Sequence, residues 1–183
     1  MTRAASGPVV GFVTAFRNEE VGFVGGLLVV NQLGRPLEFH ATTPVRPTRA
    51  HEILYGPTLS SFVMGERIAG TLIDHVKSNL SAVLTDVPEI AAGLPESRMH
   101  PIVVSSEQAG HSPQVSVTSI DQLRLSGWLF ETVARRPIDG YREALEAMRI
   151  EDWQEPFERI REALDEAQRS VRAATPRRVG EAA

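Results

Sequence analysis

Three strands are predicted for residues 9–43, VVGFVTAFRNEEVGFVGGLLVVNQLGRPLEFHATT. The polar segment Arg17–Glu20 and the turn Asn31–Gly34 interrupt runs that are rich in Val, Leu and Phe, as expected for strands joined by short turns. The predicted strands are Val9–Phe16, Val21–Val30 and Pro36–Thr43. The chain is therefore expected to begin with an antiparallel meander.

The second and third of these strands differ in the polarity of their faces. The second is apolar on both faces, which predicts a central strand covered on both sides. The pair Gly25–Gly26 in its middle predicts a bulge or a close approach of another backbone. In the third strand, Leu37, Phe39 and Ala41 share one face, and Glu38, His40 and Thr42 share the other. We therefore expect the third strand to bury its apolar face and to expose its polar face to water.

Beyond residue 44 the pattern mixes helices with short strands. Helices are predicted after the N-cap Thr48, over Leu59–Val76, after Pro88, and from Ser119, Asp139 and Asp152, and strands over Ala82–Leu84, Pro101–Val104 and Gln114–Thr118. The pieces 82–84 and 101–104 are candidates for parallel pairing. The fold class is α+β: a mostly antiparallel sheet of about four to six strands covered by helices, followed by a C-terminal helical segment. The expected divisions are 1–118, the helical segment 119–174 and a disordered tail, 175–183.

Composition excludes several classes of protein. The 183 residues include no cysteine, which rules out a disulfide framework, a zinc ribbon, an iron–sulfur site and a thiol nucleophile. A net charge of −4 makes a nucleic-acid partner unlikely on electrostatic grounds, and no run approaches the ~20 apolar residues needed to span a membrane. Lys77 is the only lysine, and this preference for arginine is typical of GC-rich bacterial genomes. We expect a bacterial cytoplasmic protein.

The last predicted helix carries a regular apolar seam. The apolar positions follow a 4-3-4-3-4 spacing and are Trp153, Phe157, Ile160, Leu164, Ala167 and Val171. One interpretation is that the helix packs on its own domain, as many amphipathic helices do. The other is that the seam binds a protein partner or a second copy of the chain, with Trp153 and Phe157 as anchors. The leading hypothesis is therefore a non-enzymatic assembly module that associates through this helix.

A second candidate site lies on the third strand and the segment after it. Glu38 and His40 share a strand face and could share a proton, and Arg46 and Arg49 could hold a phosphate or a carboxylate near a helix start. Thr48 and His51 add polar groups to this cluster, which is Glu38, His40, Arg46, Thr48, Arg49 and His51. The alternative hypothesis is a ligand-binding or hydrolytic domain for an anionic substrate, with His40 as general base and Glu38 orienting it. The competing interpretation is a solvated surface with ordinary charges.

Motifs for cofactors and metals are missing. No P-loop, dinucleotide-binding fingerprint or serine-nucleophile elbow occurs, so no cofactor is expected. The histidines lack partners at metal-ligand spacing, so no metal site is predicted; they are His40, His51, His75, His100 and His111. The pattern Asp86-Val87-Pro88-Glu89 predicts a capping box at a helix start. A carboxylate at a strand end could also act chemically in a crevice, but capping explains Asp86 more simply.

Overall fold

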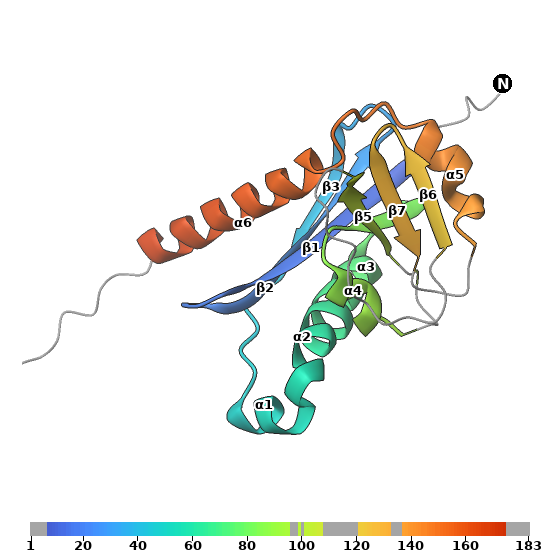
Figure 1. Ribbon diagram of the computed structural model, residues 1–183. Helices are drawn as coiled ribbons and strands as arrows, with labels where there is room; N and C mark the ends of the chain where they lie inside the picture. The colour runs from blue at the N-terminus through green and yellow to red at the C-terminus, as the bar shows by residue number, and fades with distance from the viewer. Residues whose placement is uncertain (1–6, 96–98, 100, 108–120, 133–136, 175–183) are drawn as a thin grey trace, which may run out of the picture.

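In the described part of the chain, a seven-stranded mixed sheet forms the centre of the molecule (Figure 1). The computed structural model describes residues 7–95, 99, 101–107, 121–132 and 137–174, with side chains up to residue 170. The strands are β1 (Val9–Asn18), β2 (Gly22–Asn31), β3 (Pro36–Ala41), β4 (Ala82–Thr85), β5 (Ile102–Ser106), β6 (Asp121–Leu125) and β7 (Trp128–Thr132). Their order is β3-β2-β1-β4-β5-β7-β6, with β4 parallel to β1 and β5 and the other neighbours antiparallel. The α+β class is confirmed, but the sheet is larger and more mixed than predicted.

Helices cover both faces of this sheet. The helical elements of the described residues are α1 (Arg49–Tyr55), the 3₁₀ turn η1 (Gly56–Thr58), α2 (Leu59–Ser61), the π-helical segment η2 (Phe62–Ala69), α3 (Gly70–His75), α4 (Pro88–Gly93), α5 (Asp139–Glu146) and α6 (Glu155–Ala174). Of these, α1 and η1 bury no residue and project from the sheet. Two separate clusters of buried apolar side chains lie on the two faces, one beneath α5 and α6 and one beneath α2 to α4 with η2. The described part of the chain thus forms three layers, in which β2 is covered on both sides as predicted. No helix in the described residues is long and apolar enough to cross a membrane.

The chain from 121 to 132 folds as a hairpin, which overturns the predicted helix from Ser119. β6 and β7 pair in antiparallel register, and Ser126 and Gly127 between them have φ values of 50° and 83°. Positive φ at both central residues is the geometry of the tight turns that match strand twist. Leu123 and Phe130 are buried in the cluster beneath α5 and α6. The hairpin adds two strands to the sheet, so this segment is not purely helical. The predicted strand 114–118, the start at Ser119 and the tail 175–183 lie outside the described residues.

The prediction for the two faces of β3 is wrong: the polar face is covered and the apolar face is exposed. Leu37 and Phe39 are 49% and 44% exposed, whereas the side chains of Glu38 and His40 are only 17% and 24% exposed. The reason is the placement of the two helical layers. α6 packs on β1 and β2, while α3 and the segment after it lie against β3 on the Glu38 side. The polar face is therefore covered, and the apolar face is left open.

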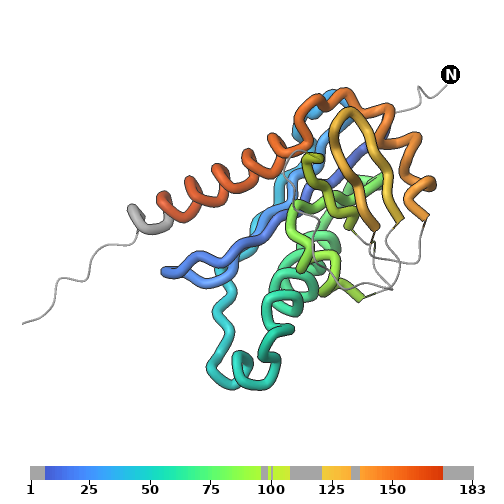
Figure 2. The backbone as a smooth tube through the Cα atoms, in the orientation of Figure 1, coloured from blue at the N-terminus to red at the C-terminus, as the bar shows by residue number. Residues whose placement is uncertain are grey.

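The first four seam residues pack on the protein's own sheet, whereas Ala167 is exposed. Trp153, Phe157, Ile160 and Leu164 are at most 3% exposed and belong to the buried cluster of β1, β2 and β4. A Cβ atom at Gly26 would lie 2.6 Å from Cγ2 of Ile160, so this glycine allows α6 to approach β2. The close neighbour of Gly26 is therefore a side chain, whereas a bulge or a close backbone approach was predicted for Gly25–Gly26. Figure 2 shows α6 running along the β1–β2 hairpin. These four predicted partner-binding residues are therefore core residues. The Val171 side chain lies outside the described part.

Candidate functional site

Two of the predicted ligand-binding residues serve to start α1. The Thr48 hydroxyl accepts a hydrogen bond from the backbone N–H of His51 (3.3 Å). Nδ1 of His51 in turn accepts one from the backbone N–H of Thr48 (3.3 Å), so the two residues form a reciprocal capping box. The prediction that Thr48 caps a helix is confirmed. The contacts of His51 and Thr48 are thus explained by helix capping.

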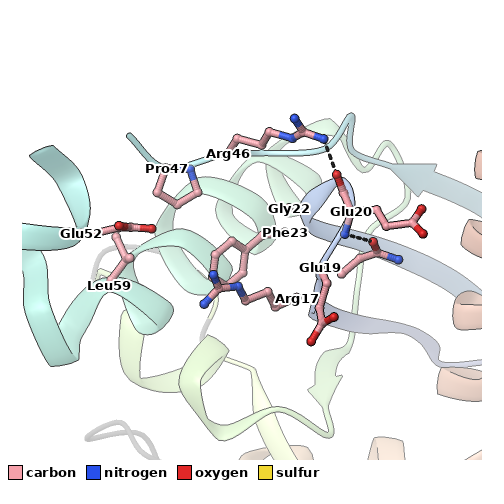
Figure 3. Close-up of a pocket in the computed structure, with 10 residues that line it drawn as sticks. Arg17, Glu19, Glu20, Gly22, Phe23, Arg46, Pro47, Glu52 and Leu59 are labelled. Carbon is pink, nitrogen blue, oxygen red and sulfur yellow. Dashed lines mark hydrogen bonds between the residues drawn. The ribbon is translucent and has the colours of Figure 1, made fainter. Parts of the chain in front are cut away.

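The two predicted anion-binding arginines also have local partners. Arg46 donates hydrogen bonds to the backbone carbonyls of Val21 (3.0 Å) and Glu20, and so ties the 41–48 segment to the β1–β2 turn (Figure 3). Arg49 is 81% exposed and pairs with Glu52 one turn later on α1 (2.9 Å). Neither arginine lines the groove that contains His40. The structure therefore does not gather the predicted cluster into one site.

Glu38 and His40 do form a pair. Nε2 of His40 lies 2.9 Å from a carboxylate oxygen of Glu38. The carboxylate also accepts hydrogen bonds from the Ser78 hydroxyl and from the backbone N–H groups of Ser78 (2.7 Å) and Lys77 (3.1 Å). The Ser78 hydroxyl above all, then His40 and the backbone donors, lower the pKa of Glu38 from 4.5 to about 2. Glu38 is therefore ionised near neutral pH and is fixed in place against His40.

A groove of about 550 Å³ lies beside His40, between the β3 end of the sheet and the helical run η2–α3. The polar side chains that line it come from these two parts of the chain and are His40, Thr42, Thr43, Arg67, Thr71 and His75. Val45 and Leu72 add apolar side chains. We call this the His40 groove. It brings together one predicted residue, His40, with Arg67 and His75, which the sequence analysis did not select.

Arg67 and His75 are presented by the outer face of the helical run. Arg67 lies in the π-helical segment η2, a rare backbone form that is frequent at functional sites. Its guanidinium has no hydrogen-bond or ion-pair partner among the described residues, and the residue is exposed. Nδ1 of His75 lies 2.8 Å from the backbone oxygen of Thr71, to which it can donate, leaving Nε2 available. The spacing Arg67, Thr71, His75 is i, i+4, i+8, and this polar stripe was the signal in the sequence that could have identified them.

The chemistry available in the His40 groove follows from these contacts. Arg67 supplies a permanent positive charge with several N–H donors, which suits phosphate and carboxylate groups. If the N–H of His40 is on Nε2, toward Glu38, then Nδ1 has a free lone pair and can accept a proton. Among the described residues, no three His, Asp or Glu side chains come together as metal ligands. The groove thus combines Arg67, which can bind an anion, with His40, whose ring is held in place by Glu38.

The fold and these contacts can be set against known proteins. Comparison of the chain with models of protein families, with curated proteins and with solved structures finds no significant match.

Proposed function

We propose that the protein binds a small molecule that carries a phosphate or carboxylate group, and that the His40 groove is its site. The observation that supports this most directly is the convergence of Arg67, His75 and His40 on one groove from two separate parts of the chain. An exposed guanidinium without a partner among the described residues is available for an anion without first breaking an ion pair. The proposal keeps the His40 site of the sequence analysis but assigns the anion contact to Arg67 in place of Arg46 and Arg49.

The remaining lining supports a ligand that is only partly polar. Val45 and Leu72 supply apolar side chains, and ligand sites typically combine such side chains with a few placed polar groups. The negative charge of Glu38 opposes anion binding less than its position suggests, because that carboxylate is engaged by Ser78, Lys77 and His40. We therefore expect an anionic group near Arg67 attached to an apolar part near Val45.

The contact between Glu38 and His40 favours a hydrolytic extension of this proposal. A carboxylate that holds one nitrogen of an imidazole fixes its orientation and stabilises the imidazolium that forms when the other nitrogen takes a proton. His40 would then remove a proton from a water molecule beside the bound anion. Binding is the primary proposal, since it does not depend on this step.

Titration with phenyl phosphate, which joins an anion to an apolar ring, tests the binding proposal. We expect isothermal titration calorimetry to detect binding, and Arg67→Gln to weaken it by about tenfold or more, or ~1.4 kcal/mol. His40→Gln should weaken it less. Arg49→Gln is the matched control, because it removes the same charge from exposed α1, away from the groove.

Two results would contradict the binding proposal, provided that all titrations are made at the same ionic strength. Absence of binding to the wild-type protein up to millimolar phenyl phosphate and inorganic phosphate contradicts the proposal. Equal weakening by Arg67→Gln and Arg49→Gln also contradicts it, since that result indicates a general charge effect. Circular dichroism of both variants checks that the fold is retained.

A further inference from the structure

We infer a second binding site, for an organic cation of the amine or guanidinium type, in a crevice at the carboxyl ends of the parallel strands β4 and β5. The crevice has a volume of about 670 Å³. The residues that line it, which we call the acidic crevice, are Asp86, Val104, Ser105, Ser106, Trp128, Glu151, Asp152, Gln154 and Glu158. In α/β sheets, ligands bind in crevices outside the carboxyl ends of parallel strands. The position of this crevice in the fold therefore makes it a candidate ligand-binding site.

Asp86, which directly follows β4, is the residue that points to a ligand. The predicted capping box is wrong, because α4 begins at Pro88 without any side-chain cap. The carboxylate instead faces α6, where one oxygen, Oδ2, accepts hydrogen bonds from Arg161 and from Gln154 (3.2 Å). The helix-capping explanation for Asp86 is thereby removed.

The other oxygen of Asp86 is the unusual feature. The side chain is only 8% exposed, and Oδ1 is buried with no hydrogen-bond partner among the residues that the structure describes. A buried acceptor without a partner is destabilising, and more so when it is charged, so native proteins rarely retain one. Since Asp86 lines the crevice, an N–H donor bound there could satisfy Oδ1.

The charge of the crevice selects the class of ligand. Asp86 shares its lining with Glu151, Asp152 and Glu158, and none of the lining residues is basic. Arg161 pairs with Asp86 from the side, which offsets one of these carboxylates and leaves the rest. An anion is therefore disfavoured in this crevice, and a cation is favoured.

The aromatic side chain in the crevice favours a planar organic cation over other cations. Trp128 is half-buried where β7 begins, opposite Ser106 of β5, and its ring is the best type for a cation–π contact. A bound metal ion fits less well, because no three acidic or histidine side chains converge among the described residues. A planar organic cation can instead contact Trp128 while it donates N–H groups to the carboxylates.

Benzamidine, a planar amidinium ion, is a suitable probe, and neutral benzamide is its matched control. We expect benzamidine to change tryptophan fluorescence and to give saturable heat by calorimetry, and benzamide to do neither. Trp128→Phe should remove the fluorescence change, since the remaining Trp153 is buried in the core. The fluorescence signal then reports binding at the crevice itself.

Charge-removing variants test the role of the carboxylates. Asp86→Asn should weaken benzamidine binding about tenfold or more. Because Asp86 also pairs with Arg161, the exposed Glu158 provides a second variant, and Glu158→Gln should weaken binding about threefold without disturbing the fold. Glu162→Gln, which removes one exposed charge of α6 outside the crevice, should leave binding unchanged.

Three results would overturn the inference. They are the absence of benzamidine binding up to about 10 mM, equal binding of benzamide, and equal effects of Glu158→Gln and Glu162→Gln. The first would indicate that ordered water satisfies Asp86. Phenyl phosphate binding at the His40 groove should be unaffected by Glu158→Gln, so the two sites succeed or fail independently.

Discussion

α6 and β3 are both amphipathic, yet they place their apolar faces in opposite environments. Phe157 on α6 is fully buried and its ring meets Phe12 of β1 edge-on, with centroids 5.3 Å apart. Phe39 on β3 is 44% exposed. An apolar stripe thus shows that a segment has two unlike faces, but it does not show which neighbour covers which face.

The difference follows from which neighbouring elements α6 and β3 contact. α6 is long enough to lay Trp153, Phe157, Ile160 and Leu164 across the sheet, and Gly26 lets it approach β2 closely. β3 is the edge strand of the described sheet and lies beyond the strands that α6 covers. Its polar face is instead fixed by the hydrogen bonds of Glu38 to the segment after α3. Assembly with a partner stays a prediction, but it would need a surface other than these α6 residues.

The largest effect is expected from shortening a residue of the buried seam. Phe157→Ala should lower the free energy of unfolding by about 3–5 kcal/mol, because it leaves a cavity between α6 and β1. Denaturant unfolding followed by circular dichroism measures this.

Leu37→Ala on β3 is the matched control. With a side chain that is 49% exposed, it should change stability by less than about 0.5 kcal/mol. If Phe157→Ala is as stable as wild type but changes the sedimentation mass, the seam binds a partner and the contrast between α6 and β3 is wrong.

An intermediate effect is expected where α6 approaches the sheet. A Cβ at Gly26 would clash with Ile160, so Gly26→Ala should cost about 1–3 kcal/mol as α6 shifts away. Denaturant midpoints measure the loss. Gly140→Ala is a suitable control, since a Cβ there meets no other atom within 4 Å. Equal behaviour of the two variants would indicate that α6 does not rest on β2.

The smallest effect is expected on the covered polar face of β3 and depends on pH. The pKa of Glu38 is lowered from 4.5 to about 2, so its ionised form stabilises the fold above pH 4.5, and this contribution is lost as the pH falls toward 2. Glu38→Gln should therefore lower the Tm at pH 7, and the difference from wild type should shrink between pH 5 and pH 2.

Thermal unfolding between pH 7 and pH 2 measures the Glu38 effect, with Glu162→Gln as an exposed control. A difference that does not vary with pH would show that the charge of Glu38 does not stabilise β3. His40 is the titratable side chain in direct contact with Glu38, so Glu38→Gln is also compared in a His40→Gln background.

Local signals in the sequence predicted most elements correctly. Runs rich in Val, Leu and Phe between polar turns identified the first three strands, Thr48 identified the start of α1, and the parallel pairing of β4 with β5 was named as a candidate. The missed hairpin carried its own signal, because Ser126-Gly127 is a turn pair between two alternating segments. Its apolar residues also fit a buried helix, and periodicity over so short a segment does not separate the two.

The candidate sites were less predictable than the elements. His40 and Glu38 were found because they share a strand face, but Arg67 and His75 lie far along the chain and meet His40 only through the packing of α3 on β3. Asp86 was assigned to a helix cap because capping depends on neighbours in sequence, whereas its contacts with α6 depend on a segment about seventy residues away.

By itself the sequence determined the period and polarity of each segment, and hence the α+β class and the positions of most helices and strands. Local hydrogen bonding and side-chain alternation act over a few residues, so they can be read from neighbours along the chain. Only the tertiary structure decided that α6 covers β1 and β2, that β3 keeps its apolar face exposed, and that Asp86 and His40 line separate grooves. These outcomes depend on which faces compete for the same sheet surface, a competition between segments that are distant in sequence.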